Sequence, residues 1–306
     1  MKILLANPRG FCAGVNMAIE ALDRAVDLFG TPLYVYHEIV HNKHVVDRFV
    51  RRGVVFVDQV EQVPRGSHLM YSAHGISPEI HRRAAARELQ IIDATCPLVR
   101  KVHWEAQRFA RQGYTILLIG HRDHDEVVGE MGEAPEQMIL VETLADVDRV
   151  VVPNPARVAY LTQTTLSIDE VREMVERIKV RFPLCVGSPK EDICYATQNR
   201  QEALKALLDT ASAVVVVGSQ NSSNSMRLAE IASAARKRAY LVDSAAELSL
   251  AEFHADETVL ITAGASAPED LVLGCVELFR NHFAATVEEH TTREEHVEFS
   301  LPLEVR

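Results

Sequence analysis

The sequence predicts an α/β protein built from parallel sheets. Apolar, β-branched runs alternate with amphipathic helical segments along the chain, which is typical of βαβ units. Several of the apolar runs are continuous, as expected for parallel strands that helices cover on both faces. Cys12, Cys96 and Cys194 occupy similar turns at similar separations along the chain, which predicts three related α/β modules.

The strands are predicted from short apolar runs that end in polar turns. These runs span residues 3–6, 33–40, 68–73, 91–94, 115–120, 158–162, 213–218, 239–243 and 259–264. Apolar residues at helical spacing follow Gly14 and stop at Gly30, which predicts a helix there. Further helix starts are marked by capping residues and prolines, at Ser77-Pro78-Glu79, Pro97, Ser167 with Glu170, and Pro268.

These elements divide the chain into five segments. We expect an N-terminal strand and loop, three α/β modules, and a charged tail with a short strand. Their boundaries are predicted at residues 1–13, 14–96, 97–193, 194–281 and 282–306. No Gly/Ser-rich or Pro-rich linker separates the modules, so we expect them to pack tightly.

The composition excludes several classes of function. The net charge of −11 and the lack of a basic run argue against nucleic-acid binding. No apolar stretch approaches the roughly 20 residues of a membrane helix, and the opening apolar run is too short for a signal peptide. We therefore expect a cytoplasmic protein without a nucleic-acid or membrane partner. The five cysteines lack paired spacing and predict no disulfide framework.

Polar, chemistry-bearing turns follow the predicted strands. In open α/β sheets, ligands bind beyond the carboxyl ends of the strands, so these turns are expected to meet around a ligand. They read NPRGFC, HEIVHN, SAHGIS, DATCP, GHRDHDE, TQTTLS, GSQNSSNS and AGASAPE. Eight turns rich in Cys, His and small polar residues indicate a site.

The cysteines fall into two groups. Cys275 shares a helical face with apolar residues, and Cys185 lies in an apolar segment, so both are expected in the core or at a strand edge. Cys12, Cys96 and Cys194 lie in turns, and three thiolates from three modules suit an iron–sulfur cluster with one open iron. A three-cysteine zinc site is the alternative.

The polar residues of these turns suit an anionic ligand. His41, His74 and His124 follow strands, and serines at a helix start provide hydroxyls together with free N–H groups. With these we group Ser222, Ser223, Asn224 and Ser266. A phosphate or diphosphate is the expected guest. Glu126 is a candidate proton donor beside His124, the alternative being a solvated loop carboxylate.

These motifs resemble the LytB/IspH family, the 4-hydroxy-3-methylbut-2-enyl diphosphate reductases. The resemblance covers residues 1 to about 280 and rests on NPRGFCAGV, HEIVHN, SAHGIS, DATCPLV, TQTTLS, DICYATQNRQ, GSQNSSNS and TAGASAP. It implies three α/β modules in a pseudo-threefold trefoil around a central [4Fe–4S] cluster. The implied reaction is reductive dehydroxylation of an allylic diphosphate to isopentenyl and dimethylallyl diphosphate, the last step of the methylerythritol phosphate route.

The resemblance also implies roles for residues. Cys12, Cys96 and Cys194 correspond to the cluster ligands, which leave one iron open. The diphosphate site corresponds to His41, His74, His124, Ser222, Ser223, Asn224 and Ser266. Glu126 corresponds to the proton donor, and Thr164 to the residue that binds the substrate hydroxyl. Asp125 replaces the proline that the family usually has; this extra carboxylate either raises the pKa of Glu126 or faces solvent.

Two electrons per turnover imply a partner such as ferredoxin or flavodoxin, because the chain lacks a dinucleotide fingerprint. Two other functions stay open at this stage. One is an iron–sulfur hydro-lyase that acts on a phosphorylated small molecule. The other is an iron–sulfur sensor or RNA-binding module, against which the acidic charge argues.

Overall fold

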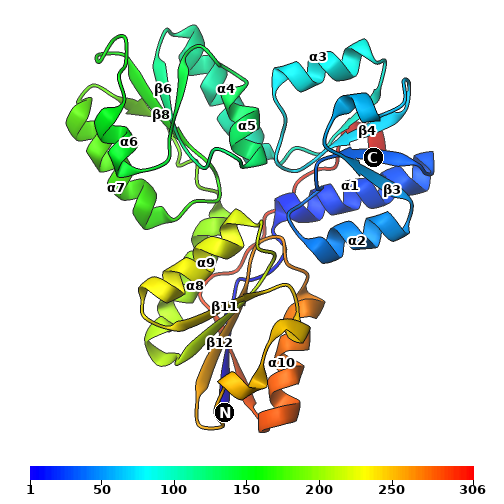
Figure 1. Ribbon diagram of the computed structural model, residues 1–306, viewed down its shortest axis with the longest axis vertical. Helices are drawn as coiled ribbons and strands as arrows, with labels where there is room; N and C mark the ends of the chain where they lie inside the picture. Colours follow the sequence, from blue (N-terminus) through cyan, green and yellow to red (C-terminus); the bar gives the residue numbers. More distant parts are fainter. The chain divides into compact units, whose positions relative to one another are not determined.

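The computed structural model describes residues 1–306 and contains three separate parallel sheets (Figure 1). The predicted α/β class with three sheet-based modules is confirmed. The chain forms two compact units, which are described one at a time. Unit 1 comprises Met1–Asn16, Val40–Phe49 and Tyr195–Glu298, and unit 2 comprises Met17–Ile39, Val50–Cys194 and Phe299–Arg306.

Unit 1 is built on a five-stranded sheet of order β11-β10-β12-β1-β13. Its strands are β1 (Lys2–Asn7), β10 (Ala213–Val217), β11 (Arg238–Val242), β12 (Thr258–Ala263) and β13 (Thr286–Thr291). Its helices are α8 (Tyr195–Leu207), α9 (Ser223–Ala234) and α10 (Glu269–Phe283). The N-terminal strand β1 lies between β12 and β13, so both ends of the chain contribute to this sheet.

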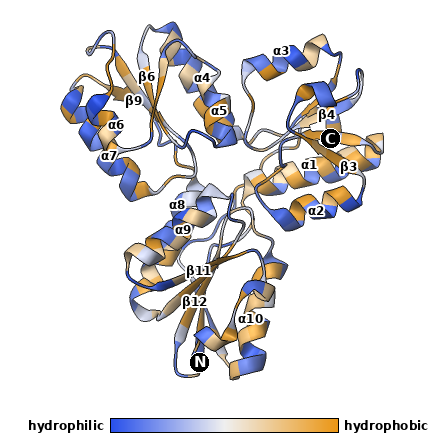
Figure 2. Ribbon diagram, in the orientation of Figure 1, coloured by the Kyte–Doolittle hydropathy of each residue, from blue (hydrophilic) through white to orange (hydrophobic).

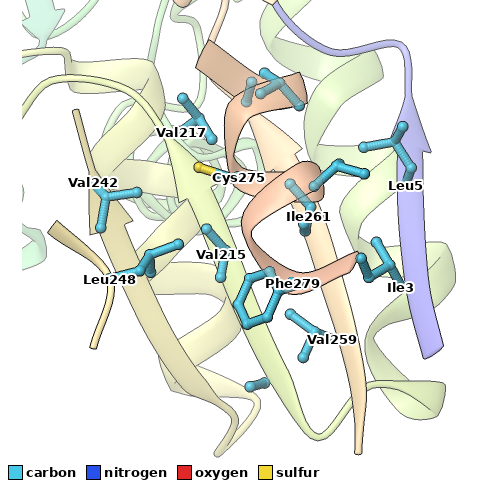
Figure 3. Packing of buried hydrophobic residues seen from close by; sticks show 14 of the residues in the cluster. Ile3, Leu5, Val215, Val217, Val242, Leu248, Val259, Ile261, Cys275 and Phe279 are labelled. Carbon is cyan, nitrogen blue, oxygen red and sulfur yellow. The ribbon is translucent and has the colours of Figure 1, made fainter. Parts of the chain in front are cut away.

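Helices cover both faces of this sheet. On one face, Cys275 and Phe279 of α10 pack against strand residues such as Val215 and Ile261 (Figure 3). On the other face, α8 and α9 pack against alternate residues of the same strands. Cys275 is fully buried, and burial raises the pKa of its thiol to about 12. Its predicted place in the core is confirmed.

Unit 2 contains two four-stranded sheets. The first has the order β3-β2-β4-β5, with β2 (Leu33–Tyr36), β3 (Val54–Val57), β4 (His68–Tyr71) and β5 (Gln90–Asp93). The second has the order β7-β6-β8-β9, with β6 (Thr115–Ile119), β7 (Met138–Val141), β8 (Val158–Thr162) and β9 (Val186–Gly187). All pairs in both sheets are parallel.

The helices of unit 2 are amphipathic. They are α3 (Pro78–Ala86), α4 (Pro97–Arg111), α5 (Asp125–Met131), α6 (Leu144–Arg149) and α7 (Ile168–Arg181). In the second sheet, α4 and α5 cover one face and α6 and α7 the other (Figure 1). Helices α1 (Ala13–Phe29) and α2 (Lys43–Arg51) have residues in both units. Figure 2 shows blue and orange residues mixed along the helices, as expected when one helical side faces a sheet.

The three sheets repeat one strand order. In each module the first strand in sequence lies between the second and the third. Thus β2 lies between β3 and β4, β6 between β7 and β8, and β10 between β11 and β12. The fourth place is taken by β5, β9 and, in unit 1, by β1. The chain therefore contains the same four-strand order three times. In the third copy the fourth strand is the N-terminal β1, and β13 adds a fifth.

Most predicted elements are confirmed within one or two residues. Helix α4 begins at Pro97, and the N–H of Glu170 donates to the Ser167 hydroxyl at the start of α7. The run 33–40 is strand only to Tyr36, and α10 begins one residue after Pro268. Strands β3, β7 and β9 were not predicted. The short strand expected in the tail is β13. No helix combines the length and apolar character needed to cross a membrane.

Candidate active site

Cys12, Cys96 and Cys194 occupy the same local position in the three repeats. Each lies directly before a helix: α1, α4 and α8, respectively. The backbone N–H groups of the three cysteines donate to the carbonyls of Ala265 (3.1 Å), Ala73 (3.0 Å) and Thr164 (3.0 Å). Each acceptor lies two residues beyond the end of a strand, namely β12, β4 and β8. The repeat therefore presents one thiol at the same sheet edge in every module.

This position suits a negatively charged ligand atom. The start of a helix carries unpaired N–H groups and the positive end of the helix dipole, which favour a thiolate over a thiol. All three side chains are half-buried rather than sealed in a core. The donor set of three cysteines without paired C-x-x-C spacing fits an iron–sulfur cluster, which is held by thiolates.

The loop before Cys12 is fixed by a buried arginine. Gly10 has φ +66°, and a Cβ there would come within 3.2 Å of the Ala267 carbonyl oxygen, so glycine is required. Its carbonyl accepts hydrogen bonds from Nε (3.1 Å) and Nη2 (2.6 Å) of Arg200 on α8. Arg200 is 1% exposed and also pairs with Glu295 of the tail at 3.1 Å. Sequence reasoning missed both Arg200 and Glu295.

A cluster of neutral polar side chains lies beside this loop within unit 1. We call Ser222, Asn224, Ser225 and Ser266 the hydroxyl–amide cluster. The Ser222 hydroxyl lies 3.2 Å from that of Ser266 and receives hydrogen bonds from Asn224 Nδ2 (2.9 Å) and the Ser225 hydroxyl (3.0 Å). The Ser266 hydroxyl in turn donates to the His41 carbonyl at 3.0 Å.

The hydroxyl–amide cluster is tied to the cysteine loop through one peptide. The Ala265 N–H donates to Asn224 Oδ1 at 2.6 Å, while the Ala265 carbonyl accepts from the Cys12 N–H. Gly264 makes this close approach possible, because a Cβ there would lie 1.9 Å from the Ser225 hydroxyl oxygen. Ser223 is the first residue of α9, and Ser222 occupies the N-cap position without a side-chain capping bond; both are buried. Unit 1 thus brings together six predicted site residues: Cys12, His41, Ser222, Ser223, Asn224 and Ser266.

The remaining predicted residues form a continuous row in unit 2. We call Thr164, Glu126, His124 and His74 the polar row. The Glu126 carboxyl accepts the Thr164 N–H at 2.6 Å and the Thr164 hydroxyl at 3.0 Å. The Glu126 N–H donates to His124 Nδ1 at 3.2 Å, which caps α5. The rings of His124 and His74 lie edge to face, 6.0 Å between centroids.

The polar row joins two cysteine turns. Thr164 supplies the carbonyl that accepts from Cys194, and His74 follows Ala73, whose carbonyl accepts from Cys96. Because His124 Nδ1 is an acceptor, the neutral ring of His124 carries its proton on Nε2 and offers an N–H there. Unit 2 therefore connects Cys96, Cys194 and all four members of the polar row.

Glu126 is suited to proton transfer. It is 1% exposed, and burial raises the pKa of its carboxyl to about 7, although the two hydrogen bonds from Thr164 act in the opposite direction. A carboxyl with a pKa near neutrality can donate a proton at neutral pH, and the resulting carboxylate can take up a proton again. The sequence left open whether Glu126 is a solvated loop carboxylate; its burial excludes that alternative.

Asp125 has a partner far away in sequence. Its Oδ1 lies 2.5 Å from Nδ1 of His37, and its Oδ2 lies 3.8 Å from Nδ1 of His74. The hydrogen bond with Asp125 raises the pKa of the His37 imidazole, against the effect of burial. The sequence suggested that Asp125 either raises the pKa of Glu126 or faces solvent, and neither alternative includes this ion pair. Sequence reasoning missed His37 as the partner of Asp125.

Comparisons with known proteins agree on one family. The family model for the LytB protein matches residues 3–280. A 4-hydroxy-3-methylbut-2-enyl diphosphate reductase of Rhodopirellula baltica is 56% identical over 306 residues, which cover 100% of this chain and 96% of that protein. A reductase of the same name from Mycolicibacterium gilvum is 51% identical, with 100% and 92% covered.

A solved structure gives the same result. The E-1-hydroxy-2-methyl-but-2-enyl-4-diphosphate reductase of Plasmodium falciparum matches with a TM-score of 0.97 and 38% identity, covering 99% of this chain and 96% of that one. The family model, the full-length relatives and this structural match therefore lead to one conclusion: the chain belongs to the LytB family.

Proposed function

We propose that this chain is a 4-hydroxy-3-methylbut-2-enyl diphosphate reductase. It removes the allylic hydroxyl reductively and releases isopentenyl and dimethylallyl diphosphate. The relatives named above carry this activity in their names, and another similar structure is described as the terminal enzyme of the non-mevalonate pathway. The observation that carries the proposal is the buried Glu126 carboxyl. It accepts a hydrogen bond from Thr164, whose carbonyl in turn accepts the Cys194 N–H.

Cys12, Cys96 and Cys194 would hold the cluster. Their equivalent turns at helix starts and their thiolate chemistry support a [4Fe–4S] cluster with one iron free of a protein ligand. When bound, such a cluster supplies single electrons and a Lewis-acidic iron. The iron–sulfur nature is expected of the family, whereas the cluster type and its ligands are part of this proposal.

Glu126 and Thr164 would transfer a proton to the departing oxygen. Thr164 donates to Glu126 through both its N–H and its hydroxyl, so it fixes the carboxyl and stabilises the carboxylate left after transfer. When Glu126 is protonated, its O–H can donate to the Thr164 hydroxyl, which can then donate its own hydrogen to the substrate oxygen. Glu126 would then protonate the departing oxygen, which leaves as water.

The diphosphate would be bound by neutral donors. The hydroxyl–amide cluster offers hydroxyls and amide N–H groups at the start of α9, where free backbone N–H groups also attract anions. His41, His74 and His124 add ring N–H donors. Hydroxyl and amide groups do not titrate near neutrality, so the hydrogen bonds from the hydroxyl–amide cluster to phosphate oxygens should change little between neutral and alkaline pH.

The reductase proposal displaces the two alternatives left open by the sequence. The relatives are named as reductases, which does not fit a hydro-lyase or an RNA-binding sensor. An electron donor such as ferredoxin or flavodoxin and a cytoplasmic location stay predictions, as do the domain boundaries.

Anaerobic purification followed by a reductant-dependent assay tests the proposal. We expect brown protein that contains iron and sulfide and that converts the allylic diphosphate only when a one-electron reductant is supplied. Substitution Cys12→Ser should reduce iron and activity, whereas Cys185→Ser, at a half-buried cysteine outside the three turns, should retain both. Colourless protein containing zinc, or loss of water from the substrate without reductant, would contradict the proposal.

A further inference from the structure

Helix α5 carries a second buried carboxyl that the proposed reaction does not use. Glu130 is fully buried and lies four residues after Glu126, so the two side chains share one face of the helix. No N–H or O–H group donates a hydrogen bond to either carboxyl oxygen of Glu130. Its interaction with the Glu126 carboxyl lowers the pKa of Glu126 and raises that of Glu130.

The surroundings of Glu130 disfavour a negative charge. Besides Glu126, the buried Asp192 acts on it, and Asp192 is already paired with Lys101 of α4 at 3.0 Å. His103, also on α4, packs close to Gly129, and its Nδ1 lies 2.7 Å from the Glu133 carboxylate. His103 lowers the pKa of Glu126 but is not among the groups that act on Glu130. Burial is the main cause that raises the pKa of Glu130 well above its usual value.

An ionised Glu130 would therefore be an unpaired buried charge next to other carboxyls. Such a charge costs several kcal/mol, which a buried carboxyl avoids by keeping its proton. A protonated carboxyl has one O–H donor to give, and the Glu126 carboxyl is the acceptor with which it interacts.

We propose that Glu130 stays protonated and donates its O–H hydrogen bond to the Glu126 carboxylate that remains after proton transfer. The proposal rests on the proposed function of Glu126. In the proton transfer, the O–H bond of Glu126 breaks and an O–H bond forms on the departing oxygen. Glu130 keeps its proton, and neither carboxyl changes its oxidation state. Glu130 acts through Glu126 and is a positioning residue that sets how readily Glu126 gives and regains its proton.

The pH dependence of kcat distinguishes a neutral from an ionised Glu130. Substitution Glu130→Gln keeps a neutral donor of the same shape, so the midpoint of the kcat profile should stay within about 0.3 pH units of wild type. Glu130→Met removes the donor, so the midpoint should move upward by about 0.5–1 unit, because burial of Glu126 is then less compensated. The exposed Glu136→Gln, a matched control for charge removal, should leave the midpoint in place.

A downward shift in Glu130→Gln would overturn the proposal, because it would mean that a negative charge had been removed. A midpoint in Glu130→Met equal to that of wild type would also overturn it. If Glu130→Met does not fold, the Gln variant decides by the sign of its shift.

Infrared spectroscopy of the holoenzyme without substrate provides a readout that does not depend on turnover. At a pH of about 8, wild type should retain the C=O band of a protonated carboxyl, which Glu130→Gln should lose and Glu126→Gln should keep. Absence of the band from wild type would overturn the proposal. A band with this pattern in a protein that does not reduce the diphosphate would leave Glu130 assigned and refute the proposed function alone.

Discussion

The hydroxyl–amide cluster of unit 1 and the polar row of unit 2 are built on equivalent loops but have different chemistry. In unit 1, Ser222 and Asn224 lie five and seven residues after β10. In unit 2, His124 and Glu126 lie five and seven residues after β6, the equivalent strand. The cluster contains only hydroxyls and an amide, none of which titrates near neutrality. The polar row contains a carboxyl with a pKa of about 7 and two imidazoles.

This difference indicates that equivalent loops of a repeated fold can have different chemical roles. The same backbone position provides a neutral hydrogen-bonding site in one repeat and a proton donor in another. Substitutions of Glu126 and Thr164 in the polar row should therefore change the rate and its pH dependence, whereas those in the cluster should change substrate binding.

Substitution Glu126→Gln should lower kcat by about 10²–10⁴-fold, because a positioned acid contributes a factor of this size. Gln retains an oxygen that accepts the Thr164 N–H, so KM should change by less than about threefold. Steady-state kinetics at equal iron content measure both constants. Near-wild-type turnover of a variant with full iron content would show that Glu126 is not the donor.

Substitution Asn224→Ala should raise KM by about 5–30-fold and leave the midpoint of the kcat profile unchanged. It removes the acceptor of the Ala265 N–H and a donor to Ser222, and such losses cost about 1–2 kcal/mol. The same kinetic assay, repeated across pH, measures the effect. A shifted midpoint would mean that the cluster also controls the proton.

Glu126→Gln should be more stable than wild type at a pH of about 8, by about 1–3 kcal/mol. The pKa of Glu126 is raised from 4.5 to about 7 in the folded protein, so the folded state holds a proton that the unfolded chain releases. Wild type therefore loses stability as the pH rises from 4.5 to 7, and neutral Gln does not. Denaturant unfolding measures this; an equal difference at pH 4.5 and 8 would contradict the assigned direction.

The His37–Asp125 pair should show a coupling of about 1 kcal/mol in a double-mutant cycle with His37→Asn and Asp125→Asn. Because the pKa of His37 is raised in the folded state, the coupling is fully present below its unfolded pKa and is lost as the pH rises through the folded pKa. Unfolding at about pH 6 and pH 9 measures it. A matched cycle with Ser222→Ala and Asn224→Ala should give the same coupling at both values, and a pH-independent His37–Asp125 coupling would contradict the prediction.

Much of the fold could be predicted because apolar strands and capped helices leave strong local signals. Strand β13 has mostly exposed side chains and is held by pairing with β1, so only a short strand in the tail could be anticipated. Strands β3 and β7 are also apolar runs, but each has only four residues, and neither run was predicted as a strand.

The candidate site was predicted from turn composition and from resemblance, and its supporting residues were not. Arg200 and Glu130 lie in ordinary helical sequence, where a charged residue is usually solvent-exposed. Their burial depends on packing between distant segments: Arg200 binds the Gly10 carbonyl, and Glu130 lies near Asp192. No local pattern encodes such contacts, nor the pairing of His37 with Asp125 across 88 residues.

The pH dependence of kcat, measured on wild type and Asn224→Ala in parallel, tests most directly whether the polar row alone carries the proton. We expect kcat to fall above a midpoint near pH 7 in both proteins, as Glu126 loses its proton. A profile without this midpoint in wild type, or one displaced by Asn224→Ala, would contradict it.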